Sequence, residues 1–148
     1  MGNSKHLKKM KEKINIGYKI PNIERLVDKI SKVIGLIVPV YVMPLKLKRL
    51  DENGYAVFQG GKYILFINPE ILKKDKLTSF VIKLFIHELW HVKQMSEGRL
   101  SFNDNHTIAT WEGKEYNSQI EHEFRPWEIE ARRMESKYYK QVKIWNYT

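Results

Sequence analysis

Cysteine is absent from this 148-residue chain, and its absence limits how the fold can be stabilised and how a metal can be bound. Neither a disulfide framework nor a thiolate metal site is possible, so any metal ion needs histidine and carboxylate ligands. The sequence also lacks an apolar run of membrane-spanning length, and residues 1–13 lack the apolar core of a secretory signal. We therefore expect a protein without membrane segments that stays in the cytoplasm of its host cell.

Acidic residues are scarce in the first third of the chain. Residues 1–50 hold 12 Lys/Arg and 3 Asp/Glu, a balance of +9, whereas residues 51–148 hold 14 of each, so the net charge of +9 belongs to the first third. We predict a flexible basic arm over residues 1–15 and one domain over residues 16–148. The Lys-rich residues 1–50 could bind nucleic acid or an acidic protein surface, although such runs are more often simply solvated.

The most informative stretch is the apolar run from Leu77 to Gly98, which contains His87-Glu88-Leu89-Trp90-His91. Two histidines four residues apart on a helix lie one turn apart on the same face, so both imidazoles can reach one metal ion. Glu88 lies beside that pair, where it can accept a proton from a metal-bound water. Thr78-Ser79 is a typical helix start and Gly98 a typical stop, so the pattern predicts a central, buried helix with this motif.

The remaining patterns predict an α+β fold. Helical spacing of apolar residues indicates a helix over residues 23–36, and Pro126 opens a final helix that reaches to about residue 145. Short β-branched segments between the first two helices predict a small, mainly antiparallel sheet with hairpins at Asn53-Gly54 and Gly60-Gly61. We expect Tyr63–Asn68 to be its edge beside the cleft, residues 101–105 to be a loop, residues 106–111 a short strand, and residues 116–124 a loop with a helical turn.

Two histidines do not complete a zinc site, because a catalytic centre needs a third protein ligand and an open position for water. Four residues are candidates: Glu128, Glu130, His106 and His122. Glu128 and Glu130 open the last helix, where a close approach at the small Ala131 could bring one carboxylate to the metal. Such glutamates also complement the helix dipole, and His122, between two glutamates, is most simply a solvated side chain.

The motif together with the downstream Glu128-x-x-Ala131 resembles the gluzincin branch of the zincin metallopeptidases, which implies a minimal zincin-like fold. The resemblance implies that Glu128 is the third ligand of a single Zn²⁺ ion, whereas Glu130 supports the ligands or faces solvent. The family often carries an Asp four residues after its ligand Glu to orient a histidine, but this chain has Arg132 there. The orienting carboxylate is then missing or comes from elsewhere.

Two further resemblances extend the possibilities. Trp111, Gly113, Tyr116 and Pro126-Trp127-Glu128 resemble small metallopeptidase-like proteins of phage and prokaryotic genomes, which makes a virion a possible location. His106 lies fifteen residues past His91, as a ligand does in the SprT-like branch, whose members act on DNA-bound proteins. His106 thus stays open as an alternative ligand.

We therefore predict a zinc-dependent hydrolase that cleaves peptide bonds in a peptide or protein substrate. His87, His91 and Glu128 would hold the ion and Glu88 would act as the catalytic base, with Tyr116 or His106 as a donor to the oxyanion. Two alternatives stay open. One is a zincin-fold structural or interaction protein, for example of a phage particle, with assembly partners and little catalysis; the other is a DNA-associated protease of the SprT-like kind.

Overall fold

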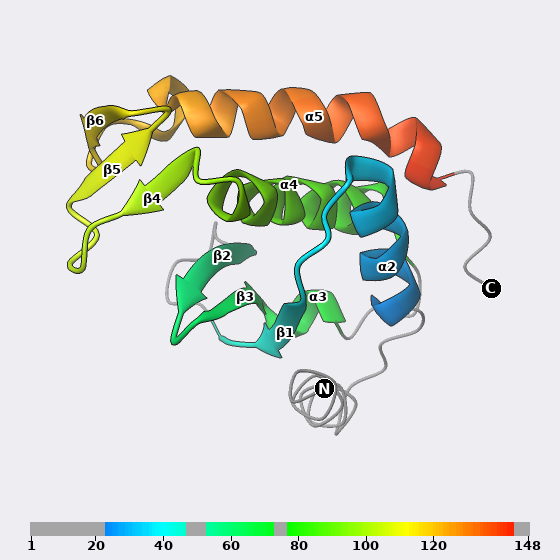
Figure 1. The fold of residues 1–148 in the computed structure, drawn as a ribbon. Coiled ribbons are helices and arrows are strands. Elements are labelled where there is room, and N and C mark those ends of the chain that lie inside the picture. Colours follow the sequence, from blue (N-terminus) through cyan, green and yellow to red (C-terminus); the bar gives the residue numbers. More distant parts are fainter. Residues whose placement is uncertain (1–22, 47–52, 73–76, 144–148) are drawn as a thin grey trace.

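The computed structural model describes residues 23–46, 53–72 and 77–143, and the predicted basic arm (residues 1–15) lies outside these ranges. The described residues form an α+β fold in which helix α4 lies between helix α5 on one side and a three-stranded sheet on the other (Figure 1). The helices are α2 (Ile23–Ile34), α3 (Pro69–Leu72), α4 (Ser79–Ser96) and α5 (Pro126–Lys143), with a 3₁₀ turn, η1 (His122–Phe124). The strands are β1 (Val40–Pro44), β2 (Gly54–Gln59), β3 (Lys62–Ile67), β4 (Leu100–Phe102), β5 (Ile108–Trp111) and β6 (Lys114–Asn117).

Helix α4 is the centre of the core, as the sequence predicts. The Thr78 hydroxyl accepts a hydrogen bond from the Val81 amide at 3.3 Å and caps the first turn. Gly98 follows the helix at a φ of 75°, a conformation that glycine adopts without steric cost. Buried side chains such as Phe85, Ile86 and Leu89 pack against α2, α5 and the sheet. Burial on so many sides holds the residues of the motif in fixed positions.

The first sheet has the order β1-β3-β2, with β1 parallel and β2 antiparallel to β3. The Gly60-Gly61 hairpin is confirmed, since both glycines have positive φ and connect β2 to β3. The prediction of a hairpin at Asn53-Gly54 is wrong, because β1 does not pair with β2 but pairs in parallel with β3. Gly54 instead allows close approach of the strands: a Cβ there would lie 2.9 Å from the Phe66 carbonyl oxygen.

The prediction that Tyr63–Asn68 forms the edge of the sheet is also wrong. Strand β3 has a partner on both sides and is therefore the centre of the sheet, whereas β2 and β1 are its edges. The apolar sequence of β3 is typical of a central strand, which packs on both faces and bonds on both edges. The edge strand that passes over α4 near the motif is β2, which contacts α4 directly.

A second sheet, β4-β5-β6, follows α4 and is antiparallel throughout. The expected strand at residues 106–111 corresponds to β5, but β4 and β6 lie in segments where the sequence predicts loops or turns. Leu100-Ser101-Phe102 alternates between apolar and polar residues, but three residues are too few for the pattern to predict a strand, and only Leu100 is buried. A separate hydrophobic cluster lies beneath this sheet and is built around Trp111 and Trp127. The helical turn expected within residues 116–124 is η1.

Helix α5 packs along α4 more extensively than any other element does among the described residues. Pro126 is its first residue, as predicted, and Trp127, Glu128, Ala131 and Val142 are its buried residues. Ala131 is fully buried, in agreement with the expected close approach of the two helices. None of the described helices is both long enough and apolar enough to cross a membrane.

Candidate metal centre

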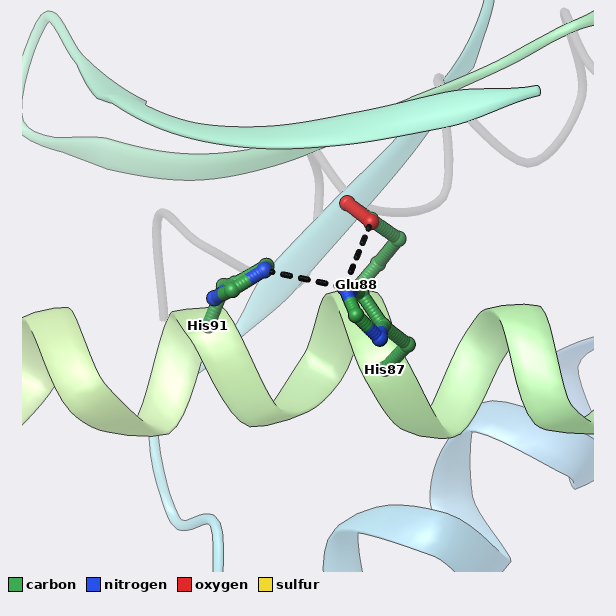
Figure 2. Close-up of side chains that lie close together, drawn as sticks. All are labelled: His87, Glu88 and His91. Atoms are coloured by element: carbon green, nitrogen blue, oxygen red, sulfur yellow. Dashed lines mark hydrogen bonds and ion pairs between the residues drawn. The ribbon is translucent and has the colours of Figure 1, made fainter. Parts of the chain in front are cut away.

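The imidazoles of His87 and His91 project from successive turns of α4 toward a common point. Their Nε2 atoms lie 3.2 Å apart, close to the separation of about 3.3 Å expected for two nitrogens bound to one tetrahedral zinc ion. The Glu88 carboxylate rises beside them toward the strands of the first sheet, with one oxygen 4.0 Å from His87 Nε2 (Figure 2). His87, Glu88 and His91 thus form a group that could hold a metal ion.

Glu128, from the first turn of α5, lies even closer to the two histidines. Its Oε1 is 2.9 Å from His87 Nε2 and 2.7 Å from His91 Nε2. Glu88 and Glu128 are therefore both near the common point, but only the Glu128 oxygen contacts both imidazoles. Of the two carboxylates, that of Glu128 lies nearer to both Nε2 atoms, at hydrogen-bond distances somewhat shorter than the separation of about 3.3 Å between two ligands of one tetrahedral zinc ion.

The other ring nitrogen of each histidine has an acceptor. His87 Nδ1 lies 3.1 Å from Glu135 Oε2, and His91 Nδ1 lies 2.8 Å from Gln94 Oε1. Since carboxylate and amide oxygens only accept hydrogen bonds, these contacts assign the proton of each neutral ring to Nδ1 and leave a lone pair on Nε2. Two nitrogen lone pairs and the Glu128 oxygen then converge on one point. This donor set fits a divalent cation such as zinc.

Gln94 is itself held in one orientation. Its amide nitrogen donates to the Trp127 carbonyl at 3.0 Å and to Glu130 Oε1 at 3.2 Å, so the amide oxygen is the atom that faces His91. Glu130 also accepts from the Trp90 indole at 2.7 Å and from both terminal nitrogens of Arg99 at 2.8 and 2.6 Å. The position of the His91 ring thus depends on a chain of contacts that begins at the buried Gln94 and ends at the partly exposed charged pair Glu130–Arg99.

The electrostatics of the group favour positive charge at its centre. Burial by itself would lower the pKa of His91, but the hydrogen bond and charge of Glu128 outweigh it and raise that pKa to about 9. For Glu128, burial would raise the pKa, yet its hydrogen bonds with His87 and His91 hold it well below the usual range. Burial raises the pKa of Glu88 to about 7, against the opposing charges of the histidines.

The remaining candidates from the sequence lie farther from the common point. Glu130 faces Arg99 rather than the histidines, and the ring of His106 lies exposed at the β4–β5 turn, 5.4 Å from that of Phe102. Tyr116 packs its ring on Trp127 at 5.8 Å, in the second hydrophobic cluster. His122, expected to be solvated, is 56% exposed but has its Nε2 2.9 Å from Glu128 Oε2.

Three supporting residues were not predicted as parts of the site: Gln94, Arg99 and Glu135. Gln94 lies three residues after His91 and Glu135 lies seven after Glu128, spacings that keep each on the face of its partner. These spacings could have indicated from the sequence that Gln94 and Glu135 belong to the site. Glu135 also supplies the orienting carboxylate that Arg132 does not. Nothing in the sequence indicates that η1 brings His122 to Glu128, because that contact depends on the path of the loop.

An open groove passes over this group. Its walls are the start of β2 on one side and the β4–β5 hairpin with η1 on the other, and it includes Glu88, His91, His122 and Glu128. A second hollow continues it along β2 toward Gly60, and the two share side chains such as Tyr55 and Phe102. The candidate centre is therefore reachable from outside along an elongated path.

Comparisons of the chain with protein-family profiles, with curated proteins and with solved structures find no match.

Proposed function

We propose that this chain is a zinc-dependent peptidase with a zincin-like arrangement of helix, sheet and motif. His87, His91 and Glu128 would hold the ion, and Glu88 would be the catalytic base. The observation that carries this proposal is the convergence of two Nε2 lone pairs and one Glu128 oxygen beside an open groove. Three acceptor atoms so close together repel one another unless a proton or a cation lies between them, and a divalent cation can satisfy all three at once.

When bound, zinc would supply an acidified water and polarise the substrate carbonyl. Glu88 would take the proton from the attacking water and then pass it to the leaving amine. A pKa raised to about 7 by burial suits both transfers, because the carboxylate can accept a proton and release it near neutral pH. Gln94 and Glu135 would keep the Nδ1 protons in place and thereby keep both Nε2 atoms directed at the ion.

The edge strand β2 supports an extended peptide as the substrate. The Asn68 amide donates to the Asn53 carbonyl at 2.9 Å, so in the alternating antiparallel pattern the backbone groups of Gly54, Ala56 and Phe58 face away from β3. These groups line the groove and could bond to a substrate backbone as a further strand. Of the two donors suggested for the oxyanion, His106 lines this groove, whereas Tyr116 is not among its lining residues.

Zinc content and hydrolysis of an unfolded protein or peptide library, measured on the wild type and on Glu88→Gln, test this function. We expect one zinc per chain in both proteins and a loss of about 100-fold or more in hydrolysis in the variant. Glu97→Gln, at the exposed end of α4, is the matched control and should keep full activity. A wild-type protein that binds no zinc on titration would refute the proposal. Stoichiometric zinc without hydrolysis of any library would refute the peptidase and leave the ion a structural role.

A further inference from the structure

Helix α5 separates its charges between two sides. Its three carboxylates, Glu128, Glu130 and Glu135, all contact partners on α4 or on Arg99. Its five cationic residues are all exposed, and they make up what we call the cationic face: Arg132, Arg133, Lys137, Lys140 and Lys143. Within the described residues no carboxylate forms an ion pair with any of these five. The carboxylates of α5 therefore lie toward the candidate centre, and the exposed charges of this helix are all positive.

We propose that the cationic face binds the phosphate backbone of double-stranded nucleic acid. Residues 132–143 cover about 16 Å of helix, which corresponds to about five nucleotides of one strand along a duplex. Cations in the last turn complement the helix dipole, and this accounts for Lys140 and Lys143 but not for Arg132 or Arg133. The net charge of +9 on the whole chain adds long-range attraction for a polyanion.

The side chains around the cationic face favour a duplex over other polyanions. Tyr138 and Tyr139 are half-buried, and Lys137 and Lys83 lie over their rings at 5.3 and 4.9 Å, so neither of these two rings offers a free face to stack on single-stranded bases. Between the cations there is no bulky exposed apolar side chain to enter a lipid surface; Ile129 lies before the first of them. Contacts of this kind position a protein on a backbone without reading sequence.

The cationic face and the groove lie on different sides of α5. Glu128 and Glu135 mark the side that faces α4, whereas the five cationic residues are exposed, and α5 itself lies on the side of α4 away from the first sheet (Figure 1). A bound duplex would therefore leave the groove along β2 open. This inference concerns a second surface and does not depend on zinc or on hydrolysis.

The experiment is the salt dependence of binding of the full chain to a fluorescent 20-base-pair duplex, followed by anisotropy. In the triple variant Arg133→Gln/Lys137→Gln/Lys140→Gln we expect affinity at about 0.1 M salt to fall at least about tenfold. The slope of log affinity against log salt should decrease by about 3, close to 0.9 for each phosphate that the variant no longer neutralises. The matched control, Lys46→Gln/Lys62→Gln/Lys114→Gln, removes the same charge from the second sheet and from the first sheet with the segment after β1, and should keep the wild-type slope.

Thermal unfolding of both triple variants establishes that they are folded, and Glu88→Gln should bind the duplex like the wild type. Equal slopes for the two triple variants would overturn the proposal, because the attraction would then come from overall charge or from residues outside α5. Binding to vesicles containing phosphatidylserine, or to an acidic protein, without binding to the duplex would overturn it as well.

Discussion

The two histidines of the candidate centre lie one turn apart on the same helix, yet their surroundings differ. His87 donates from Nδ1 to the carboxylate of Glu135, whose side chain is 26% exposed. This chain of contacts ends at Glu135. His91 donates to the fully buried amide of Gln94, which is fixed in turn by Glu130, Trp127 and, through Glu130, by Arg99 and Trp90. The first is a direct contact near solvent that water can replace. The second is a network that is buried at Gln94 and becomes partly exposed only at its outer end, Glu130 and Arg99.

One fold thus holds two neighbouring imidazoles in two different ways. A charged acceptor near solvent makes the ring more basic but constrains it weakly. A neutral acceptor in a buried network fixes the ring firmly. Removal of one partner then costs more free energy, because a buried polar group is left without a hydrogen bond. If the proposed centre is correct, the His91 side should be more sensitive to mutation than the His87 side.

The largest effect should follow removal of the residue that both sides share. We expect Glu128→Ala to weaken zinc binding more than about 100-fold, beyond the range of outer partners, because Oε1 of Glu128 contacts both histidines. Competition with a chelator of known affinity measures this loss, and Glu123→Ala, an exposed residue of η1, is the control. A loss below about tenfold would instead assign the third position to Glu88.

The difference between the two histidines is tested by comparing Gln94→Leu, which removes the acceptor of His91, with Glu135→Leu, which removes that of His87. We expect about a 100-fold loss of zinc affinity for Gln94→Leu and about a tenfold loss for Glu135→Leu, the two ends of the range for outer partners of a ligand. Water can reach His87 Nδ1 when Glu135 is removed, whereas His91 is 7% exposed and its Nδ1 would stay without an acceptor. Equal losses, or a greater loss for Glu135→Leu, would contradict the proposed difference.

The outer part of the network is tested by Glu130→Gln. An amide in place of the carboxylate weakens the contacts with Arg99 and gains a donor that faces other donors, so we expect a loss of about 1–3 kcal/mol in the free energy of unfolding. The control is Glu112→Gln, which contacts the same Arg99 at 3.3 Å but is 55% exposed. That change should cost less than about 1 kcal/mol in urea unfolding. A cost for Glu112→Gln as large as that for Glu130→Gln would show that the exposure of the glutamate does not set the strength of its contact with Arg99.

The smallest effect concerns pH and can be measured in chelator-treated protein. The pKa of His91 is raised from 6.5 to about 9, so its contribution to stability is complete below about pH 6.5 and is lost as pH rises through 9. The pKa of Glu128 is lowered from 4.5, so its contribution is present above about pH 4.5 and is lost as pH falls. The midpoint of thermal unfolding should therefore fall from pH 6.5 to 9, and Glu128→Gln should flatten this slope. A midpoint that rises over this range would contradict it.

Local patterns of the chain were sufficient to predict the parts of the site that lie on one helix. The i, i+4 spacing of His87 and His91, the Thr78 cap, the Gly60-Gly61 hairpin and the Pro126 start of α5 follow from the fixed geometry of helices and turns. The contacts between helices could not be derived in that way. The resemblance to gluzincins indicated Glu128, but the spacing alone left Glu128, Glu130 and His106 open, because the rotation of α5 against α4 decides which carboxylate faces the histidines.

That one helix carries two imidazoles and a carboxylate at neighbouring positions follows from the chain's local pattern alone, since the period of an α-helix requires no tertiary contact. Three features depend on contacts between distant segments: β3 rather than β1 pairs with β2, Gln94 and Glu135 are the acceptors of the two imidazoles, and η1 brings His122 to Glu128. These features join residues far apart in the chain or depend on which surfaces are buried. Such choices depend on packing of the whole core and not on any local preference.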